Sequence, residues 1–188
     1  MSTLKEKALI MDEAAMERAI SRIAFEIIEK NKGTDSLAII GIQRRGVSLA
    51  KKITEKIRQV EGVDVPMGIL DITLYRDDLS LLNYSPVING TEIDFMITDA
   101  RIVLVDDVLY TGRTIRAAID QLMDFGRPKM IQLAVLVDRG YRELPIRPDY
   151  VGKNVPTSTS EVVEVQVAEF DGCNRVVIMD KQSGGENE

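Results

Sequence analysis

The sequence predicts an α/β protein in which a mostly parallel, twisted sheet is flanked by helices. Segments with apolar residues at helical spacing alternate with short apolar runs that are typical of strands. Four of the strand segments are apolar at nearly every position instead of at alternate positions. Strands of that kind are buried on both faces, as they are in parallel sheets covered by helices.

The predicted elements follow one another in a regular order along the chain. The helices are expected at Asp12 to Lys32, Val47 to Val60 and Thr114 to Phe125. The strands are expected at Leu37 to Ile42, Met67 to Leu74, Ile102 to Val105, Met130 to Val137, Val162 to Ala168 and Arg175 to Met179. Gly33 and Gly126 are expected to end the first and third helices, and Lys181 to Glu188 to form a frayed tail.

Composition limits the chemistry that is open to the protein. Its 188 residues fit one domain, residues 1–188, and 45% of them are hydrophobic. The absence of histidine excludes Ser-His-Asp and Cys-His arrangements and zinc sites built from histidine. Cys173 is the only cysteine, so the chain has no internal disulfide and no thiol metal cluster. A net charge of −6 argues against indiscriminate binding of nucleic acid.

The chain also lacks the sequence signals of membrane insertion and export. No apolar run approaches the roughly 20 residues that a membrane-spanning helix needs. The segment from Met1 to Lys7 lacks the apolar centre of a secretory signal. Together with the single cysteine, these features predict a cytoplasmic protein with no membrane partner.

Polar clusters follow four of the predicted strands directly. They are Gln43-Arg-Arg-Gly46, Tyr75-Arg-Asp-Asp78, Asp106-Asp107 followed by Thr111-Gly-Arg-Thr114, and Asp138-Arg-Gly140. The carboxyl ends of parallel strands meet at one edge, which is the edge where open α/β sheets bind ligands. We therefore expect these clusters to form one site.

The segment from Ile102 to Thr114 indicates the kind of ligand. An apolar strand ends in Asp106 and Asp107, whose carboxylates can accept hydrogen bonds from sugar hydroxyls. A turn containing Gly112 follows, and a helix then begins at Thr114, where unpaired N–H groups and the helix dipole favour a phosphate. The alternative is an ordinary strand-ending turn. The combination of acids and turn favours a sugar phosphate.

That segment resembles the phosphoribosyl pyrophosphate (PRPP) motif of type I phosphoribosyltransferases. Leu70 to Leu79, Leu133 to Gly140 and Arg142 to Arg147 resemble the bifunctional pyrimidine-operon attenuator and uracil phosphoribosyltransferase family, and the resemblance extends from about Ala8 to near Met179. It implies the type I phosphoribosyltransferase fold with a flexible hood or lid at roughly residues 75–99. It also implies the reaction of uracil with PRPP to give UMP and pyrophosphate, with Mg²⁺ as counter-ion. The metal ligands stay open.

The resemblance implies a role for each matching residue. The expected catalytic residues are Asp106 and Asp107, which would bind the ribose hydroxyls, and Arg76, which would contact pyrophosphate. The expected substrate-binding residues are Arg44, Arg45, Gly46, Val108, Leu109, Tyr110, Thr111, Gly112, Arg113, Thr114, Val137, Asp138 and Arg139.

The loop from Gly41 to Ser48 can also be interpreted as a nucleotide-binding P-loop. Its spacing nearly fits that motif, but Val47 stands where the motif needs a lysine to reach the phosphates. The resemblance instead makes this segment a pyrophosphate loop.

Three functions stay open at this level. The first is a uracil phosphoribosyltransferase that also regulates pyrimidine genes by binding a messenger-RNA leader, with UMP or UTP as effector. The others are the enzyme alone, and a nucleotide-sensing RNA binder with weak catalysis. Candidate RNA-binding residues are Arg22, Arg142, Arg147 and Lys153. Phe25 and Tyr141 stand where the RNA-regulating relatives usually carry histidine. The resemblance also implies a homodimer or a higher homo-oligomer.

Overall fold

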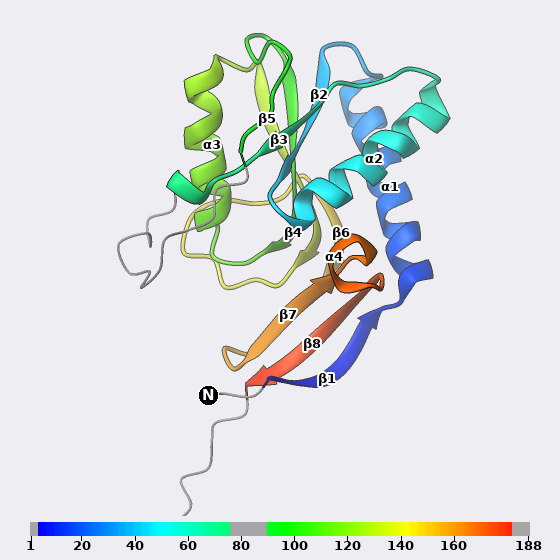
Figure 1. Ribbon diagram of the computed structural model, residues 1–188, viewed down its shortest axis with the longest axis vertical. Coiled ribbons are helices and arrows are strands. Elements are labelled where there is room, and N and C mark those ends of the chain that lie inside the picture. Colours follow the sequence, from blue (N-terminus) through cyan, green and yellow to red (C-terminus); the bar gives the residue numbers. More distant parts are fainter. Residues whose placement is uncertain (1–3, 76–89, 182–188) are drawn as a thin grey trace, which may run out of the picture.

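The central feature of the fold is a five-stranded parallel sheet. The computed structural model describes residues 4–75 and 90–181, and its parallel strands lie in the order β3-β2-β4-β5-β6 (Figure 1). Their bounds are Leu37–Ile42 for β2, Met67–Leu70 for β3, Arg101–Leu109 for β4, Met130–Asp138 for β5 and Tyr150–Asn154 for β6. The mostly parallel sheet predicted from the sequence is therefore confirmed.

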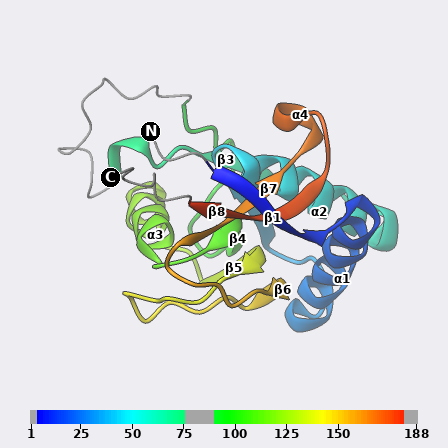
Figure 2. The same ribbon diagram turned by 90° about the horizontal axis from the view of Figure 1, so that it is seen from below.

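Helices cover both faces of this sheet. The helices α1 (Glu13–Asn31) and α2 (Arg45–Glu61) pack on one face, and α3 (Arg113–Phe125) packs on the other (Figure 2). Neighbouring residues of β2 show the alternation, since Ile39 belongs to the core under α1 and α2, whereas Ile40 belongs to the core under α3. Because both faces are covered, β2 is buried along its whole length.

A second, antiparallel sheet lies beyond the carboxyl end of the parallel one (Figure 1). Its strands are β1 (Leu4–Met11), β8 (Arg175–Lys181) and β7 (Glu161–Gln166), in the order β1-β8-β7. The sequence analysis predicts β7 and β8 but not this separate sheet. Val163, Val165 and Val176 join the core under α1 and α2, so the two sheets share one hydrophobic interior.

Four elements are not predicted from the sequence: β1, β6, the short helix α4 (Ala168–Asp171) and the 3₁₀ helix η1 (Thr73–Tyr75). β1 carries three charged residues and is mostly exposed, so it shows no buried face of its own. β6 contains Gly152, which strand propensity disfavours. A Cβ at Gly152 would lie 2.4 Å from the carbonyl oxygen of Leu136, so the close approach to β5 requires glycine there.

Two predicted strand ends differ from the structure by four residues, and each difference has a physical reason. β4 does not end before Asp106 but continues to Leu109, because its hydrogen-bonded ladder with β5 runs on through Asp106, Val108 and Leu109. β3 ends at Leu70 instead of Leu74. There the Asp71 carboxylate accepts a 2.9 Å hydrogen bond from the Thr73 N–H, which replaces the strand by a turn.

The helix ends agree more closely with the sequence. Asp12 caps α1 by accepting a 2.7 Å hydrogen bond from the Ala15 N–H, and Lys32 and Gly33 end the helix with positive φ angles. The helix α2 begins at Arg45, two residues before the predicted start at Val47. Arg45 and Gly46 therefore belong to the first helical turn and not to a preceding loop.

The predicted lid covers residues 75–99, and its residues 76–89 lie outside the described residues. The described end of this segment is packed against the parallel sheet. Glu92 forms an isolated bridge with Ile69 of β3, and Ile97 is buried in the core under α3.

Candidate active site

Two adjacent acids inside β4 form the centre of the candidate site. Asp106 is only 6% exposed and accepts a 2.9 Å hydrogen bond from the Asp107 N–H. Asp107 in turn accepts a 2.8 Å bond from the Val108 N–H. Burial raises the pKa of both carboxyl groups, and the charge of Asp107 raises the pKa of Asp106 further. Each carboxylate still has oxygen lone pairs that can accept hydrogen bonds from hydroxyl groups of a ligand.

The loop from Tyr110 to Thr114 connects these acids to α3. Gly112 adopts a φ of 95°, a conformation that disfavours other residues, and α3 begins directly after it. The 13-residue helix has no side-chain cap at its start, so its first N–H groups face the loop. The loop is fixed from outside, since the Thr111 carbonyl accepts hydrogen bonds from the N–H groups of Glu143 and Leu144.

The pyrophosphate loop predicted at Gln43 to Gly46 approaches the same strand end. The peptide bond between Gln43 and Arg44 is cis. A Cβ at Gly46 would lie 2.5 Å from the Val105 carbonyl oxygen and 3.2 Å from the Asp106 Cα. Glycine at position 46 thus lets the start of α2 lie against the strand that carries the two acids.

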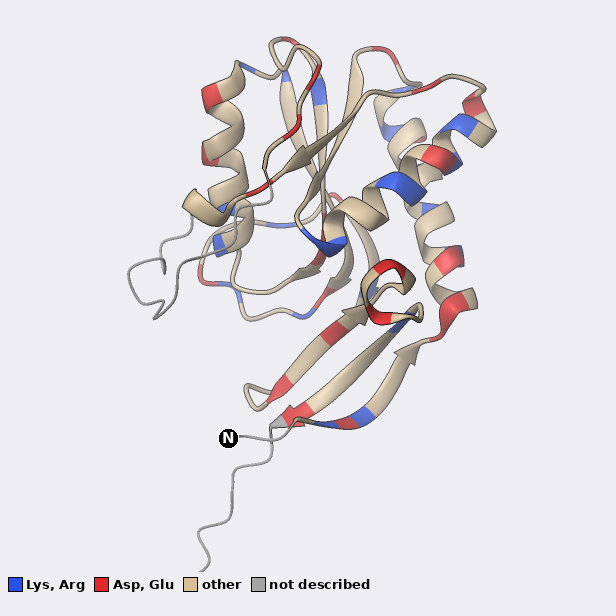
Figure 3. Ribbon diagram, viewed as in Figure 1, with Lys and Arg blue, Asp and Glu red and all other residues tan. Residues whose placement is uncertain are grey.

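Both arginines of this loop contact α4, which carries acidic residues beside the basic start of α2 (Figure 3). Arg45 pairs with Asp171 through two hydrogen bonds, of 2.8 Å from Nη2 and 3.2 Å from Nε. The Arg44 guanidinium lies 5.1 Å from the centre of the Phe170 ring. The sequence analysis missed these partners, because α4 is too short to show helical periodicity.

Residues at the end of β5 form the base side of the site that the sequence predicts. Val137 is fully buried, whereas Asp138 is partly exposed. Asp138 pairs with Arg142 at 2.6 Å and accepts a 3.0 Å hydrogen bond from the Gly140 N–H. Asp138, Arg142 and Arg147 line one wide hollow of about 540 Å³.

Arg139 also lines that hollow, and its guanidinium contacts the start of the antiparallel sheet. Its side chain donates to Thr157 Oγ1 at 3.1 Å and to the Glu161 carbonyl at 2.9 Å. The guanidinium also stacks on the Tyr110 ring, at 4.0 Å from the ring centre. Arg139 is 6% exposed and therefore braces the loop after β4 against the second sheet.

The candidate RNA-binding residues gather around β6, but several of them are also used inside the protein. Arg22 donates to the carbonyls of Val151 and Gly152 at 3.1 and 2.6 Å and pairs with Glu26 at 2.9 Å. Lys153 donates to the Ile10 carbonyl at 3.2 Å. Arg147 is exposed.

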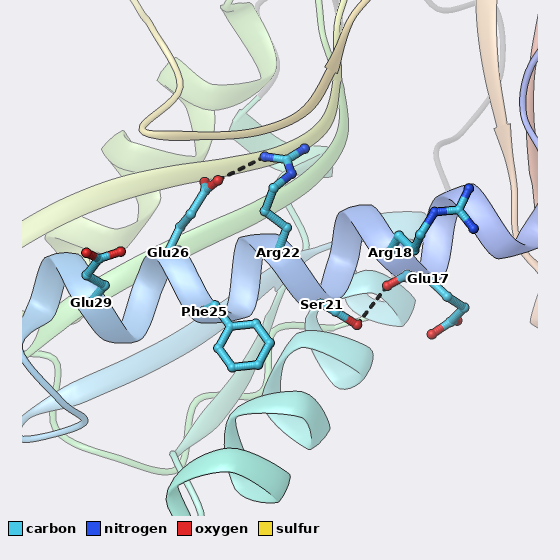
Figure 4. Close-up of a pocket in the computed structure, with 7 residues that line it drawn as sticks. All are labelled: Glu17, Arg18, Ser21, Arg22, Phe25, Glu26 and Glu29. Carbon is cyan, nitrogen blue, oxygen red and sulfur yellow. Dashed lines mark hydrogen bonds and ion pairs between the residues drawn. The ribbon is translucent and has the colours of Figure 1, made fainter.

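Phe25 lies on the outer face of α1, as the apolar stripe of that helix predicts. It is 55% exposed, and Figure 4 shows it projecting from a different side of the helix from the Arg22–Glu26 pair. Tyr141 is also exposed and packs edge-on against Tyr110, with ring centres 6.3 Å apart.

The structure thus brings together most of the site predicted from the sequence. The acids, the Tyr110–Thr114 loop and the start of α2 meet at the carboxyl end of β4, and the end of β5 lies beside them. Arg76 is outside the described residues, so its predicted contact with pyrophosphate stays a prediction. The described residues contain no group of three or more His, Cys, Asp or Glu side chains placed to hold a metal ion.

This fold and this constellation are those of a phosphoribosyltransferase, and the comparison with known families agrees. Residues 9–169 match the family model described as the phosphoribosyl transferase domain. Within that class the chain belongs to the bifunctional PyrR family. The Bifunctional protein PyrR of Acetivibrio thermocellus is 74% identical over 179 residues, which cover 95% of this chain and 97% of that protein. The protein of that name from Clostridioides difficile is 60% identical over 173 residues, covering 92% and 98%.

Solved structures share the fold at low sequence identity. A hypoxanthine-guanine phosphoribosyltransferase from Bacillus anthracis superposes with a TM-score of 0.70 at 18% identity, covering 92% of this chain and 98% of that one. A hypoxanthine phosphoribosyltransferase of Trypanosoma cruzi gives 0.71 at 17% identity, covering 94% and 98%. The predicted type I phosphoribosyltransferase fold and the predicted family are therefore both confirmed. No helix in the described part of the chain is long and apolar enough to cross a membrane.

Proposed function

We propose that the protein joins uracil to PRPP, giving UMP and pyrophosphate, and regulates pyrimidine genes by binding a messenger-RNA leader. The observation that supports the enzymatic part is the position of the adjacent acids, the buried Asp106 and the half-buried Asp107. They lie between a glycine turn that opens α3 and the glycine that lets α2 approach β4. A phosphorylated pentose that carries a diphosphate matches this arrangement: its phosphate would lie at the start of α3, its ribose at the two acids and its diphosphate at the start of α2.

Each end of PRPP finds a complementary group in this arrangement. The ribose hydroxyls would donate hydrogen bonds to Asp106 and Asp107, and the 5-phosphate would accept from the N–H groups at the start of α3. The diphosphate would lie at the start of α2, near the positive charges of Arg44 and Arg45. Uracil would enter beside Val137 and Asp138, from the hollow at the end of β5.

The chemistry needs positioning and charge more than a nucleophile. Displacement at the anomeric carbon leaves the ribose ring positive and the departing diphosphate negative. Asp106 and Asp107 would place negative charge near the ring, and the arginines would place positive charge near the leaving group. Negative charge at the ribose and positive charge at the diphosphate both lower the free-energy barrier to breaking the bond between them. No covalent enzyme intermediate is needed, which suits a chain without histidine.

Mg²⁺ fits this site as a partner of the substrate. It prefers oxygen ligands and commonly binds through one or two carboxylates together with substrate phosphates and water. Asp106 and Asp107 supply such carboxylates, and the lack of a larger acidic cluster among the described residues fits an ion held mainly by PRPP. When bound, Mg²⁺ would offset the negative charge of the diphosphate.

The RNA-binding part of the proposal rests on the surface around β6. Arg22 and Lys153 are joined to the backbone there, and Arg147 lies on the adjoining hollow, so positive charges are gathered on a chain of net charge −6. The exposed Phe25 ring on α1 could stack on a base. This proposal includes UMP or UTP as effector, a homodimer or higher homo-oligomer, a cytoplasmic location and one domain with a lid at about residues 75–99.

A substrate assay tests the enzymatic part. Steady-state turnover is measured with PRPP and, in turn, uracil, orotate, hypoxanthine and adenine. We expect turnover with uracil, and none after the double change Asp106→Asn and Asp107→Asn. Binding of PRPP without consumption of any base would instead favour a nucleotide-sensing RNA binder.

A gel shift with the upstream leader RNA tests the regulatory part. The complex should weaken as salt rises, because each phosphate contact releases counter-ions. Lys153→Ala should weaken it at every salt concentration, whereas Lys56→Ala, in α2, should not. An enzyme that binds the leader no better than an unrelated RNA would be the enzyme alone.

A further inference from the structure

We propose that Asp171 of α4 is a positioning residue for PRPP binding, acting through Arg45 at the start of α2. This inference rests on the proposed function, since it assigns Arg45 to the diphosphate. It gives the antiparallel sheet a part in the reaction, because α4 connects β7 to β8. The residue that orients the pyrophosphate loop thus comes from the other end of the chain.

The contact between the two residues is specific in geometry. Arg45 donates to Asp171 Oδ1 from Nη2 at 2.8 Å and to Oδ2 from Nε at 3.2 Å, so one edge of the planar guanidinium binds both oxygens of the carboxylate. A two-bond pair of this kind fixes direction as well as distance. The Arg45 side chain is about one-third exposed, so one side of it stays open to a ligand.

Asp171 is held in place by hydrogen bonds that do not involve Arg45. Its Oδ2 accepts a 2.9 Å hydrogen bond from the Val167 N–H, and its own N–H donates to the Val167 carbonyl at 2.8 Å. α4 is also docked independently of Arg45. Glu169 bonds to Ser48 and pairs with Lys51 at 3.3 Å, and Phe170 lies under Arg44. The carboxylate is therefore a fixed point against which Arg45 is oriented.

The pair also keeps Arg45 from a competing partner. Asp107 is close enough for its charge to raise the pKa of Arg45, and Arg45 lowers the pKa of Asp107 in return. Without Asp171, the guanidinium is free to turn toward Asp107, which is the group assigned to the ribose. One substitution would then disturb the sites of the diphosphate and the ribose together.

PRPP affinity measured by titration calorimetry in the presence of Mg²⁺ tests this inference. We expect Asp171→Asn to weaken PRPP binding about tenfold, because the arginine loses a charge-assisted partner. Arg45→Lys should show a similar loss, since lysine keeps the charge but cannot form the two-bond pair. Asp171→Glu should recover part of the affinity, and the KM for uracil should change much less than the KM for PRPP.

Two controls separate positioning from a general role in packing. Glu169→Gln changes an acid of the same helix that contacts α2 but not Arg45, and it should leave PRPP affinity within about twofold of wild type. In an Arg45→Ala background, Asp171→Asn should have no further effect, because the partner through which it acts is gone.

Three results would overturn the inference: unchanged PRPP affinity in Asp171→Asn, an equal loss in Glu169→Gln, or an undiminished effect of Asp171→Asn in the Arg45→Ala background. Should Asp171→Asn fail to fold, Arg45→Lys with wild-type PRPP affinity would overturn it equally. PRPP binding by wild type without consumption of uracil would overturn only the proposed reaction, because affinity is measured without turnover.

Discussion

Arg142 donates a 2.8 Å hydrogen bond from Nη1 to the backbone carbonyl of Tyr110 and so joins the loop after β5 to the loop after β4. The same guanidinium donates to the Ile146 carbonyl at 2.8 Å and pairs with Asp138 at 2.6 Å. One side chain therefore connects the predicted base side of the site to the predicted phosphate loop. The assignment of Arg142 to the RNA-binding set stays a prediction beside this internal role.

Arg142→Ala is accordingly expected to impair catalysis as well as stability. The substitution removes the ion-pair partner of Asp138 and a donor to the carbonyls of Tyr110, Gly140 and Ile146, which should cost roughly 2 to 3 kcal/mol of unfolding free energy. The KM for PRPP and for uracil should both rise by roughly tenfold, because both loops lose their common brace. Chemical denaturation and steady-state kinetics measure the two effects.

Arg147→Ala is the matched control for that change. Arg147 lines the same hollow and is exposed, and no described residue forms a hydrogen bond or ion pair with it. We expect wild-type stability and turnover for this variant, and weaker RNA binding. If Arg142→Ala and Arg147→Ala have the same kinetics, Arg142 does not support the site by connecting the loops after β4 and β5.

Asp106→Asn should stabilise the protein while abolishing turnover. The raised pKa of Asp106 means that the folded state favours the protonated acid. The stability contributed by this group is therefore fully present below its unfolded pKa and is lost as pH rises through the folded value. At pH 7 the amide should gain roughly 1 to 2 kcal/mol over the buried charge, and this gain should shrink toward pH 4.

Thermal melting across that pH range measures the effect. Asp120→Asn, at an exposed position of α3 where the acid pairs with Arg116 at 3.2 Å, serves as the control and should shift the melting temperature little at any pH. A lower melting temperature for Asp106→Asn at pH 7 would mean that the buried charge is better compensated than its surroundings indicate.

Gly46→Ala should inactivate the enzyme with a modest loss of stability. Its methyl group would lie 2.5 Å from the Val105 carbonyl oxygen, so the start of α2 must move away from β4. We expect a loss of roughly 1 to 3 kcal/mol and at least a hundredfold fall in kcat/KM for PRPP. Gly33→Ala adds the same methyl group where nothing lies within 4 Å, and it should reduce stability without affecting turnover.

Alkaline unfolding should reflect Tyr150, whose phenol is buried beside Asn31. Burial raises the pKa of Tyr150 to about 12, above the ordinary value of 10.0. The folded state thus favours the protonated phenol, whose contribution is complete below pH 10 and is lost between pH 10 and 12. Denaturation at several pH values should show that Tyr150→Phe loses less stability over this interval than wild type does.

The parallel sheet could be predicted from sequence because its strands are uniformly apolar. Leu37–Ile42 and Met130–Asp138 are apolar at nearly every position, which is typical of strands covered on both faces. Their predicted bounds agree with the structure to within one residue. β1 could not be predicted in the same way, since its pairing with β8 depends on residues some 170 positions away in sequence. Local propensity carries no information about such a partner.

The site shows the same division. Asp106, Asp107 and Gly112 carry a local pattern, and the structure places the two acids inside β4 near its carboxyl end and Gly112 directly before α3. The partners of Arg44 and Arg45 were missed, because an isolated arginine in a sequence does not indicate which carboxylate or ring it will meet. The signal that was present is small: two acids and an aromatic residue directly before Gly172.

The pairing of β1 with β8 brings the first and last described segments of the chain side by side. During synthesis on a ribosome, Leu4–Met11 emerges first and has no strand partner until Arg175–Lys181 has been translated. Asp171 of α4, which contacts Arg45, is likewise among the last residues to leave the exit tunnel. A nascent or prematurely terminated polypeptide that ends before Arg175 would therefore contain the whole PRPP motif and still lack the pairing of β1 with β8 in the sheet that anchors α4.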